Sequence, residues 1–150
     1  IGDQSQEVRV QVYDFQPSTR VWVKNRRDII GEEGETQHLG SSISLSADGT
    51  ILAVAANGHD GVDYSSMPAQ PLTDSGTVRV YHYNNGHGRW YPMCCDMDGL
   101  SENERSGVVS LSSDGKRLAI GSPQNDNDNG DQSGNCRIFD LLGGIPLAKS

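Results

Sequence analysis

A short turn sequence occurs twice in this chain, and its surroundings are repeated with it. Residues 44–49 read Ser-Leu-Ser-Ala-Asp-Gly, and residues 110–115 read Ser-Leu-Ser-Ser-Asp-Gly. In both places an apolar run, a polar loop, a Ser-Gly pair and a segment with a basic second residue follow in the same order. A repeat of this length indicates units that cannot bury both faces alone and therefore stack on their neighbours.

The repeat divides the chain into three parts. Residues 1–40 hold a partial unit, with its last two strands and a connecting loop, and residues 41–106 hold a complete unit and its connecting loop. Residues 107–150 hold a second complete unit. We expect all three parts to belong to one domain of a longer chain.

The partial unit is matched to the next unit through Trp22, which corresponds to Trp90. The tripeptide Val-Arg-Val occurs at residues 8–10 and again at residues 78–80. Matching these tripeptides requires a two-residue bulge at Gln11 and Val12, which we therefore predict.

The periodicity within each unit is that of β-strands. Serines alternate with Ile43 and Leu45, which gives a period of two. Asp-Gly between two short apolar runs favours a hairpin, because glycine readily adopts positive φ. Ten strands are predicted, at residues 8–15, 20–26, 41–46, 51–56, 77–83, 89–94, 107–112, 117–122, 135–141 and 145–149.

The order of these motifs resembles a blade of a β-propeller. The closest resemblance is to the FG-GAP repeats of integrin α-subunit heads, and the Ser-x-Asp-Gly turn is also similar to that of WD-type blades. Leu39-Gly40 stands where such a repeat begins, and Ala-Ile-Gly-Ser-Pro at residues 119–123 approximates its second motif. The resemblance implies an all-β fold, a β-propeller segment of about two and a half four-stranded antiparallel blades. It also implies an extracellular or cell-surface location.

A propeller needs small residues where its blades converge and large residues in the wider outer gaps. The alternating serines are expected at the inner strands. The outer gaps are expected to be filled by Tyr13, Trp22, Tyr81, Trp90 and Phe139. Two and a half blades do not close a ring, so we expect the remaining blades of the same chain, or other subunits, as partners.

The charge of the chain limits its partners. A formal net charge of −8 argues against nucleic acid or an anionic membrane surface as the main partner. No run of about 20 apolar residues is present, so no insertion into a membrane is expected.

Calcium is the one cofactor that a sequence pattern suggests. Residues 125–131 read Asn-Asp-Asn-Asp-Asn-Gly-Asp, which resembles a calcium loop. A register that begins at Asn125 places the glycine correctly but offers amides, whereas Asp126, Asp128 and Asp131 supply the charge. The alternative is a solvated hairpin loop of turn-forming residues. The Ser-x-Asp-Gly turns themselves are too short to surround the ion.

The longest insertion, at residues 57–75, is the candidate binding loop. Within it, the residues predicted to contact a partner are Asp60, Asp63, Met67 and Asp74. Asp60 and Asp63, together with Asp126, Asp128 and Asp131 of the candidate calcium loop, are expected to form an acidic rim that attracts basic or calcium-bridged partners.

No hydrolase, phosphate-binding or zinc-protease motif occurs in the chain. We therefore expect no enzyme but a non-catalytic interaction or scaffold module that binds protein or glycan through its loops or assembles into a larger structure. The alternative is a propeller-type hydrolase, in a calcium-dependent form or not, with its site on the ring axis. The three cysteines are expected to be buried or half-buried thiols. The alternative is a disulfide from Cys94 or Cys95 to Cys136 or to a segment outside these residues.

Overall fold

The computed structural model describes residues 8–24, 26–31, 38–125 and 133–141. This part of the chain is all-β and contains no helix. Its strands are β1 (Arg9–Val10), β2 (Asp14–Gln16), β3 (Val21–Val23), β4 (Ile29–Ile30), β5 (Leu39–Leu45), β6 (Ile51–Ala56), β7 (Gly61–Asp63), β8 (Gln70–Leu72), β9 (Thr77–Asn84), β10 (Arg89–Pro92), β11 (Met97–Asp98), β12 (Val108–Leu111), β13 (Arg117–Ser122) and β14 (Asn135–Asp140).

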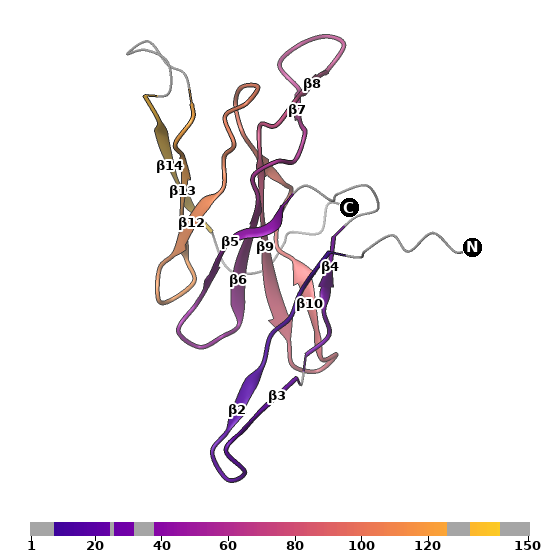
Figure 1. The fold of residues 1–150 in the computed structure, drawn as a ribbon, viewed down its shortest axis with the longest axis vertical. Coiled ribbons are helices and arrows are strands. Elements are labelled where there is room, and N and C mark those ends of the chain that lie inside the picture. Colours follow the sequence, from indigo (N-terminus) through magenta and orange to yellow (C-terminus); the bar gives the residue numbers. More distant parts are fainter. Residues whose placement is uncertain (1–7, 25, 32–37, 126–132, 142–150) are drawn as a thin grey trace, which may run out of the picture.

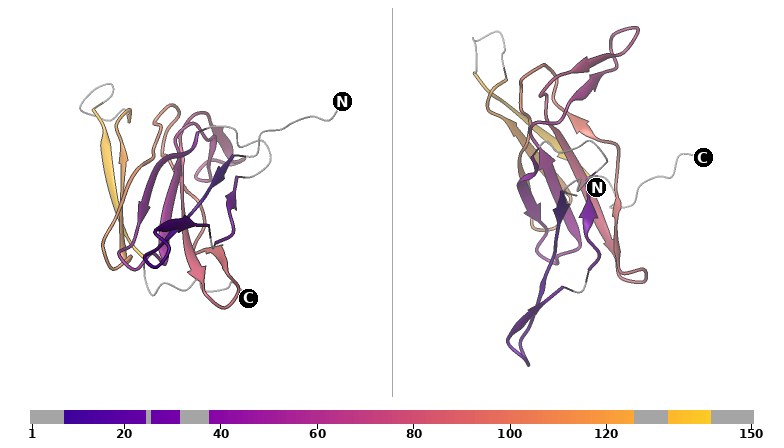
Figure 2. Two further views of the ribbon diagram at one scale, coloured as in Figure 1. Left: turned by 60° about the horizontal axis from the view of Figure 1, so that its bottom comes forward. Right: turned by 45° about the vertical axis from the view of Figure 1, so that its right-hand side comes forward.

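The strands form several antiparallel sheets, none of which closes on itself among the described residues. The largest sheet has the order β10-β9-β6-β5, and β11 also pairs with β9 beyond the end of β10. A second sheet has the order β12-β13-β14 and lies beside the first (Figures 1 and 2). The ribbon β1-β4 lies against the other side of the large sheet, whereas the ribbon β2-β3 projects beyond the end of that sheet (Figure 1). Strands β7 and β8 form a separate hairpin.

The two Ser-x-Asp-Gly turns have the same hydrogen bonds. In the first turn the Ser46 hydroxyl accepts the Ile51 N–H at 2.9 Å and donates to Asp48 Oδ1 at 2.7 Å. Gly49 has a φ of +69°, a conformation that costs a glycine little. The equivalent bonds and the equivalent positive φ occur in the second turn, at Ser112, Asp114, Gly115 and Arg117. These residues are therefore required by the turn and not by a ligand.

The two larger sheets meet at β5 and β12. The Ser42 hydroxyl accepts the Val109 N–H at 3.1 Å, and the Ser44 hydroxyl accepts the Leu111 N–H at 2.8 Å. The prediction that the serines lie where neighbouring sheets converge is confirmed for this pair of strands. Short side chains let the two strands approach, and their oxygens satisfy backbone donors that would otherwise be buried without a partner.

The large sheet is covered on both faces, which explains why β6 is buried along nearly its whole length. Ala53 and Ala55 face the second sheet and pack with Leu118 and Ile120. Leu52 and Val54 face the other way and form a separate cluster, which also contains Ile29 and Trp90. The core of the described chain thus consists of two layers between sheets and not of one central mass.

The partial unit keeps a constant spacing to the next unit, so the predicted bulge at Gln11 and Val12 is wrong. Val10 pairs with Ile29 in the same way that Val78 pairs with Met97. The tilted aromatic pairs Phe15–Trp22 and Tyr83–Trp90 also correspond, each with ring centroids 5.2 Å apart. This register places Gln11, not Arg9, at the position of Arg79. Accordingly, the Gln11 amide donates to Asp28 where the Arg79 guanidinium donates to Asp96.

Other expectations need correction as well. The sequence predicted neither the β7-β8 hairpin nor the short strands β4 and β11, and the strand expected at 145–149 lies outside the described residues. Trp90 is buried as expected, whereas Trp22 is 65% exposed because no further sheet covers β3 in the described chain. All three cysteines are free and exposed, so their expected burial is wrong.

The equivalent serines of the two sheets allow a matched test of the contact between β5 and β12. Ser44→Ala removes the acceptor of the Leu111 N–H and should lower the free energy of unfolding by about 1 kcal/mol. Ser110, the equivalent residue of β12, is exposed, so Ser110→Ala should leave the free energy of unfolding nearly unchanged. Urea unfolding of both variants measures the difference. Equal losses would contradict the proposed role of the Ser44 hydroxyl.

Candidate functional site

The long insertion between β6 and β9 forms a hairpin that projects beyond the end of the large sheet (Figure 1). Its base is closed by backbone bonds, because the His59 N–H donates to Ala56 O at 3.1 Å and the Gly76 N–H donates to His59 O at 2.9 Å. Strands β7 and β8 then pair in the register Gly61 to Leu72. The insertion is thus an ordered element with its own ladder.

The base of the hairpin is closely packed against the chain that follows β10. The Gly61 N–H donates to the buried Ser75 hydroxyl at 3.0 Å, and the Val62 N–H donates to Asp98 Oδ2 at 3.4 Å. A Cβ atom on Gly61 would lie 2.5 Å from Ser75 Oγ and 2.9 Å from Asp98 Cβ, so the close approach requires glycine. The hairpin therefore begins from a rigid support.

The aspartates of the hairpin accept hydrogen bonds within the loop. Asp63 accepts from the backbone and hydroxyl of Ser65, at 2.8 and 2.6 Å, and from the Ser66 hydroxyl at 2.7 Å. The Ser65 hydroxyl, followed by the Ser66 hydroxyl, lowers the pKa of the Asp63 carboxyl below its ordinary value. Asp60 accepts the Asp74 N–H at 2.9 Å. Each of these carboxylates thus stabilises the conformation of the loop through hydrogen bonds and also contributes a negative charge.

Two large apolar side chains stand at the far end of the hairpin. Met67 is 96% exposed and Tyr64 is 80% exposed. Neither contributes to the core, and both are supported by a loop whose turn is fixed by Asp63. Exposed aromatic and methionine side chains are typical of the central residues of protein interfaces. The tip is therefore the part of this loop with the features of a contact surface.

The structure brings the four predicted contact residues onto one hairpin. Asp60 and Asp74 lie at its base, and Asp63 and Met67 lie toward its tip. Tyr64 was not predicted as a contact residue, because nothing at the equivalent position of the other units marks it in the sequence.

The candidate calcium residues Asp126, Asp128 and Asp131 lie outside the described residues. Within the described ranges, no three metal-ligating side chains of the His, Cys, Asp or Glu type come together. Asn125 is described and is buried, and its side-chain amide donates to the Ser101 hydroxyl at 3.5 Å. Its backbone carbonyl accepts the Gly134 N–H at 3.0 Å, as His59 accepts that of Gly76. Asn125 thus closes the base of its loop.

Comparison with known proteins adds no assignment. No family model matches the chain, and no curated protein matches it either. No helix in the described part of the chain is long and apolar enough to cross a membrane.

The role of Asp63 in the hairpin is testable by titration. We expect carboxyl-carbon NMR to give Asp63 a pKa below 3.8, and Ser65→Ala should raise it toward this value. A carboxyl whose pKa is depressed by folding stabilises the loop above the pKa of the unfolded chain, and this contribution is lost as the pH falls through the folded-state value.

Asp114 is a matched control in the same spectra. Its pKa is also lowered, first by the Ser112 hydroxyl, and it lies in the turn between β12 and β13, so Ser65→Ala should not affect it. An Asp63 titration that is the same in both proteins would contradict the assigned hydrogen bonds.

Proposed function

We propose that this chain is a segment of a β-propeller that serves as a non-catalytic interaction module, with a protein or glycan bound through the loops between the second and third strands of its units. The observation that carries the proposal is the β7-β8 hairpin. It combines a base fixed by Gly61 and Ser75 with a tip at which Tyr64 and Met67 are almost fully exposed. Exposing such side chains on a structured loop has no benefit for folding.

The stacking of the sheets supports the propeller part of this proposal. The serines of β5 face β12, while Ile43 and Leu45 on the opposite side of β5 are 57% and 48% exposed. On β12 the side that corresponds to the serines of β5 carries Ser110 and Val108, and both are exposed. At one end of the stack β5 thus exposes its apolar face, and at the other end β12 exposes the face that corresponds to the serine face of β5.

Faces of this kind favour further units on both sides. In the proposed propeller they are supplied by the rest of the same chain or by other subunits. An extracellular or cell-surface setting belongs to the same proposal, and so does calcium in the loop at residues 125–131. A basic partner suits the net charge of −8.

The proposed completion of the stack is tested by the intact mass of the protein from its natural source. We expect a mass well above 16.2 kDa, because further units of the same chain would cover the exposed faces of β5 and β12. A mass near 16.2 kDa, together with larger assemblies in native mass spectrometry, would assign the completion to other subunits. A monomer of that mass that unfolds cooperatively would contradict the proposal.

The contact role of the hairpin tip is tested by paired substitution. Glycan arrays and arrays of extracellular protein domains are incubated with the full-length protein, and the affinity for each ligand found is then measured. The double variant Tyr64→Ser, Met67→Ser should weaken binding by about tenfold or more, as expected when residues at the centre of an interface are truncated.

Val21→Ser is the control for this experiment, because Val21 is an exposed apolar residue on β3 that lies outside the hairpin. It should leave the affinity unchanged. Equal affinities of the wild type and the double variant for every ligand found would exclude the hairpin tip as the contact surface.

A further inference from the structure

A groove of about 760 Å³ lies between the partial unit and the large sheet. It is lined by Lys24, Arg26, Arg27, Asp28, Ile29, Ile30, Tyr81, Arg89 and Trp90. Among the described residues that line it, four side chains are cationic and one is anionic, in a chain whose formal net charge is −8. The described lining of the groove is thus opposite in sign to the chain as a whole.

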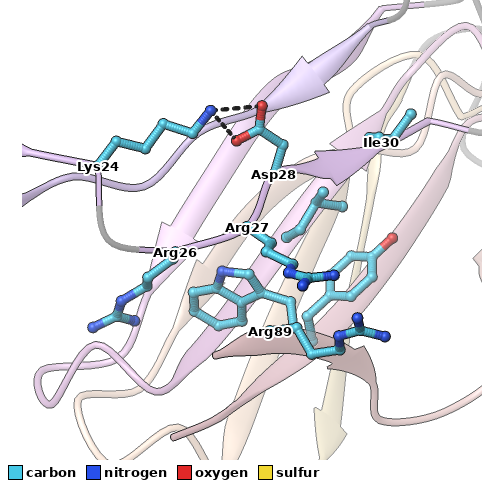
Figure 3. A pocket seen from close by; sticks show the side chains of 9 residues that line it. Lys24, Arg26, Arg27, Asp28, Ile30 and Arg89 are labelled. Atoms are coloured by element: carbon cyan, nitrogen blue, oxygen red, sulfur yellow. Dashed lines mark hydrogen bonds and ion pairs between the residues drawn. The ribbon is translucent and has the colours of Figure 1, made fainter. Parts of the chain in front are cut away.

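Two of the cations are occupied by protein partners. Lys24 Nζ lies 2.6 Å from Asp28 Oδ1, and this ion pair neutralises the only carboxylate among the lining residues (Figure 3). Arg26 donates to Gly49 O, lies 3.3 Å from Asp14 Oδ1 and stacks over the ring of Tyr83 at 4.3 Å. Arg26 therefore joins the partial unit to the large sheet.

The side chains of the other two cations, Arg27 and Arg89, are exposed and form no hydrogen bond or ion pair with the described part of the chain. In Figure 3 their guanidinium groups are directed to the same side of the pocket, whereas that of Arg26 is directed the opposite way. Two like charges that line one groove repel each other, and an anion between them would replace this repulsion with two attractions.

Trp90 contributes an aromatic wall to the groove. It is only 9% exposed, and its indole Nε1 is buried without a hydrogen-bond partner among the described residues, so the ring and not the N–H faces a ligand. An aromatic ring packs favourably against the apolar parts of an organic molecule. A ligand in the groove would therefore lie beside Trp90.

We propose that this groove binds a sulfate or phosphate monoester, with the anionic group held by Arg27 and Arg89 and the organic part beside Trp90. The planar fork of a guanidinium matches the oxygens of such groups, and charge-assisted hydrogen bonds of this kind are strong. The groove is larger than the ion alone, so it also accommodates an organic part of about the size of one sugar. This inference does not depend on the hairpin or on the function proposed for it.

The next pair of layers contains an internal comparison. The register places Cys94 and Cys95 at the positions of Arg26 and Arg27. The described residues that line the groove at this second location, about 310 Å³ in volume, are Met93, Cys94, Cys95, Met97, Phe139, Asp140 and Leu141, and none of these is cationic. The two adjacent arginines at residues 26 and 27 are thus particular to one location and are not required by the repeated scaffold.

Tryptophan fluorescence tests the proposal directly, since the chain has only two tryptophans. In a Trp22→Phe background, Trp90 is the sole reporter, and Trp22 is exposed and absent from the groove. The full-length protein with this substitution is titrated with inorganic phosphate, inorganic sulfate, glucose 6-phosphate and glucose 6-sulfate, at constant ionic strength set with chloride. Neutral glucose serves as the blank.

We expect a saturable change in Trp90 fluorescence with both esters, at a Kd no higher than that of the corresponding inorganic ion. A lower Kd for the phosphate or for the sulfate compounds identifies the preferred group. The absence of a saturable change with all four compounds would overturn the proposal, and so would a response to chloride of the same size, which would indicate ionic strength alone.

Substitutions distinguish the groove from general electrostatics. Arg27→Gln and Arg89→Gln should each raise the Kd by about tenfold or more, because each removes charged donors to the ligand. Arg117→Gln removes the same charge from a site on β13 that is 73% exposed, and it should leave the Kd unchanged. Arg27→Lys keeps the charge without the fork and should give an intermediate Kd.

Circular dichroism of each variant confirms that it is folded before the Kd is compared. If the double variant Arg27→Gln, Arg89→Gln binds as tightly as the parent, the assignment of the groove is wrong. Binding to a protein or glycan array through Tyr64 and Met67 would be unaffected by this result, so the two proposals fail separately.

Discussion

Two serine hydroxyls of β5 hold the inner strands of neighbouring sheets together, and the order of the layers depends on this contact. Strands that approach face to face, without a ladder between them, leave backbone N–H groups that need acceptors. Ser42 and Ser44 supply these acceptors to Val109 and Leu111 at 3.1 and 2.8 Å. Longer side chains would hold the sheets apart, and alanine would leave the donors unsatisfied. The contact also gives the stack a direction, because the serines lie on one side of β5 and apolar residues on the other.

The outer part of the stack obeys a different constraint. In both units an aromatic pair joins two neighbouring outer strands, and the pairs Phe15–Trp22 and Tyr83–Trp90 have the same centroid distance of 5.2 Å. Arg26 lies over the second pair at 4.3 Å from the Tyr83 ring and donates to the Gly49 carbonyl of the turn. The outer layer can thus accept charge, whereas the inner layer has room only for small side chains.

The sequence predicts those parts of the fold that local chemistry determines. Strands β6 and β13 have the predicted bounds, because an Asp-Gly turn and an apolar run define each of them. The predicted equivalence of Arg9 and Arg79 is wrong. It was based on the identical tripeptides at residues 8–10 and 78–80, whereas the pairing of Val10 with Ile29 makes Gln11 the equivalent of Arg79. The all-β class is confirmed, and the number of blades stays a prediction.

The hairpin and the groove also differ in how far the sequence predicts them. The hairpin residues, from Asp60 to Asp74, are close in sequence, so one long insertion was enough to group them. Tyr64 was not singled out because exposure at a hairpin tip depends on the direction of a side chain. The groove could not be predicted, since Arg27 and Arg89 come from separate units and their lack of partners is a tertiary property.

The contrast between Arg26-Arg27 and Cys94-Cys95 shows where a repeated scaffold is free to acquire specific chemistry. Neither position belongs to the Ser-x-Asp-Gly turn or to the serine contact of the inner strands. Arg26 contacts the Gly49 carbonyl of the turn from outside, and the internal hydrogen bonds of both turns are the same without it. Both positions lie after the outermost strand, beside the gap between layers, where a change from thiol to guanidinium replaces an apolar groove with a basic one. The inner strands preserve the stack, and its outer edge is therefore the place where a ligand site can arise without destabilising the fold.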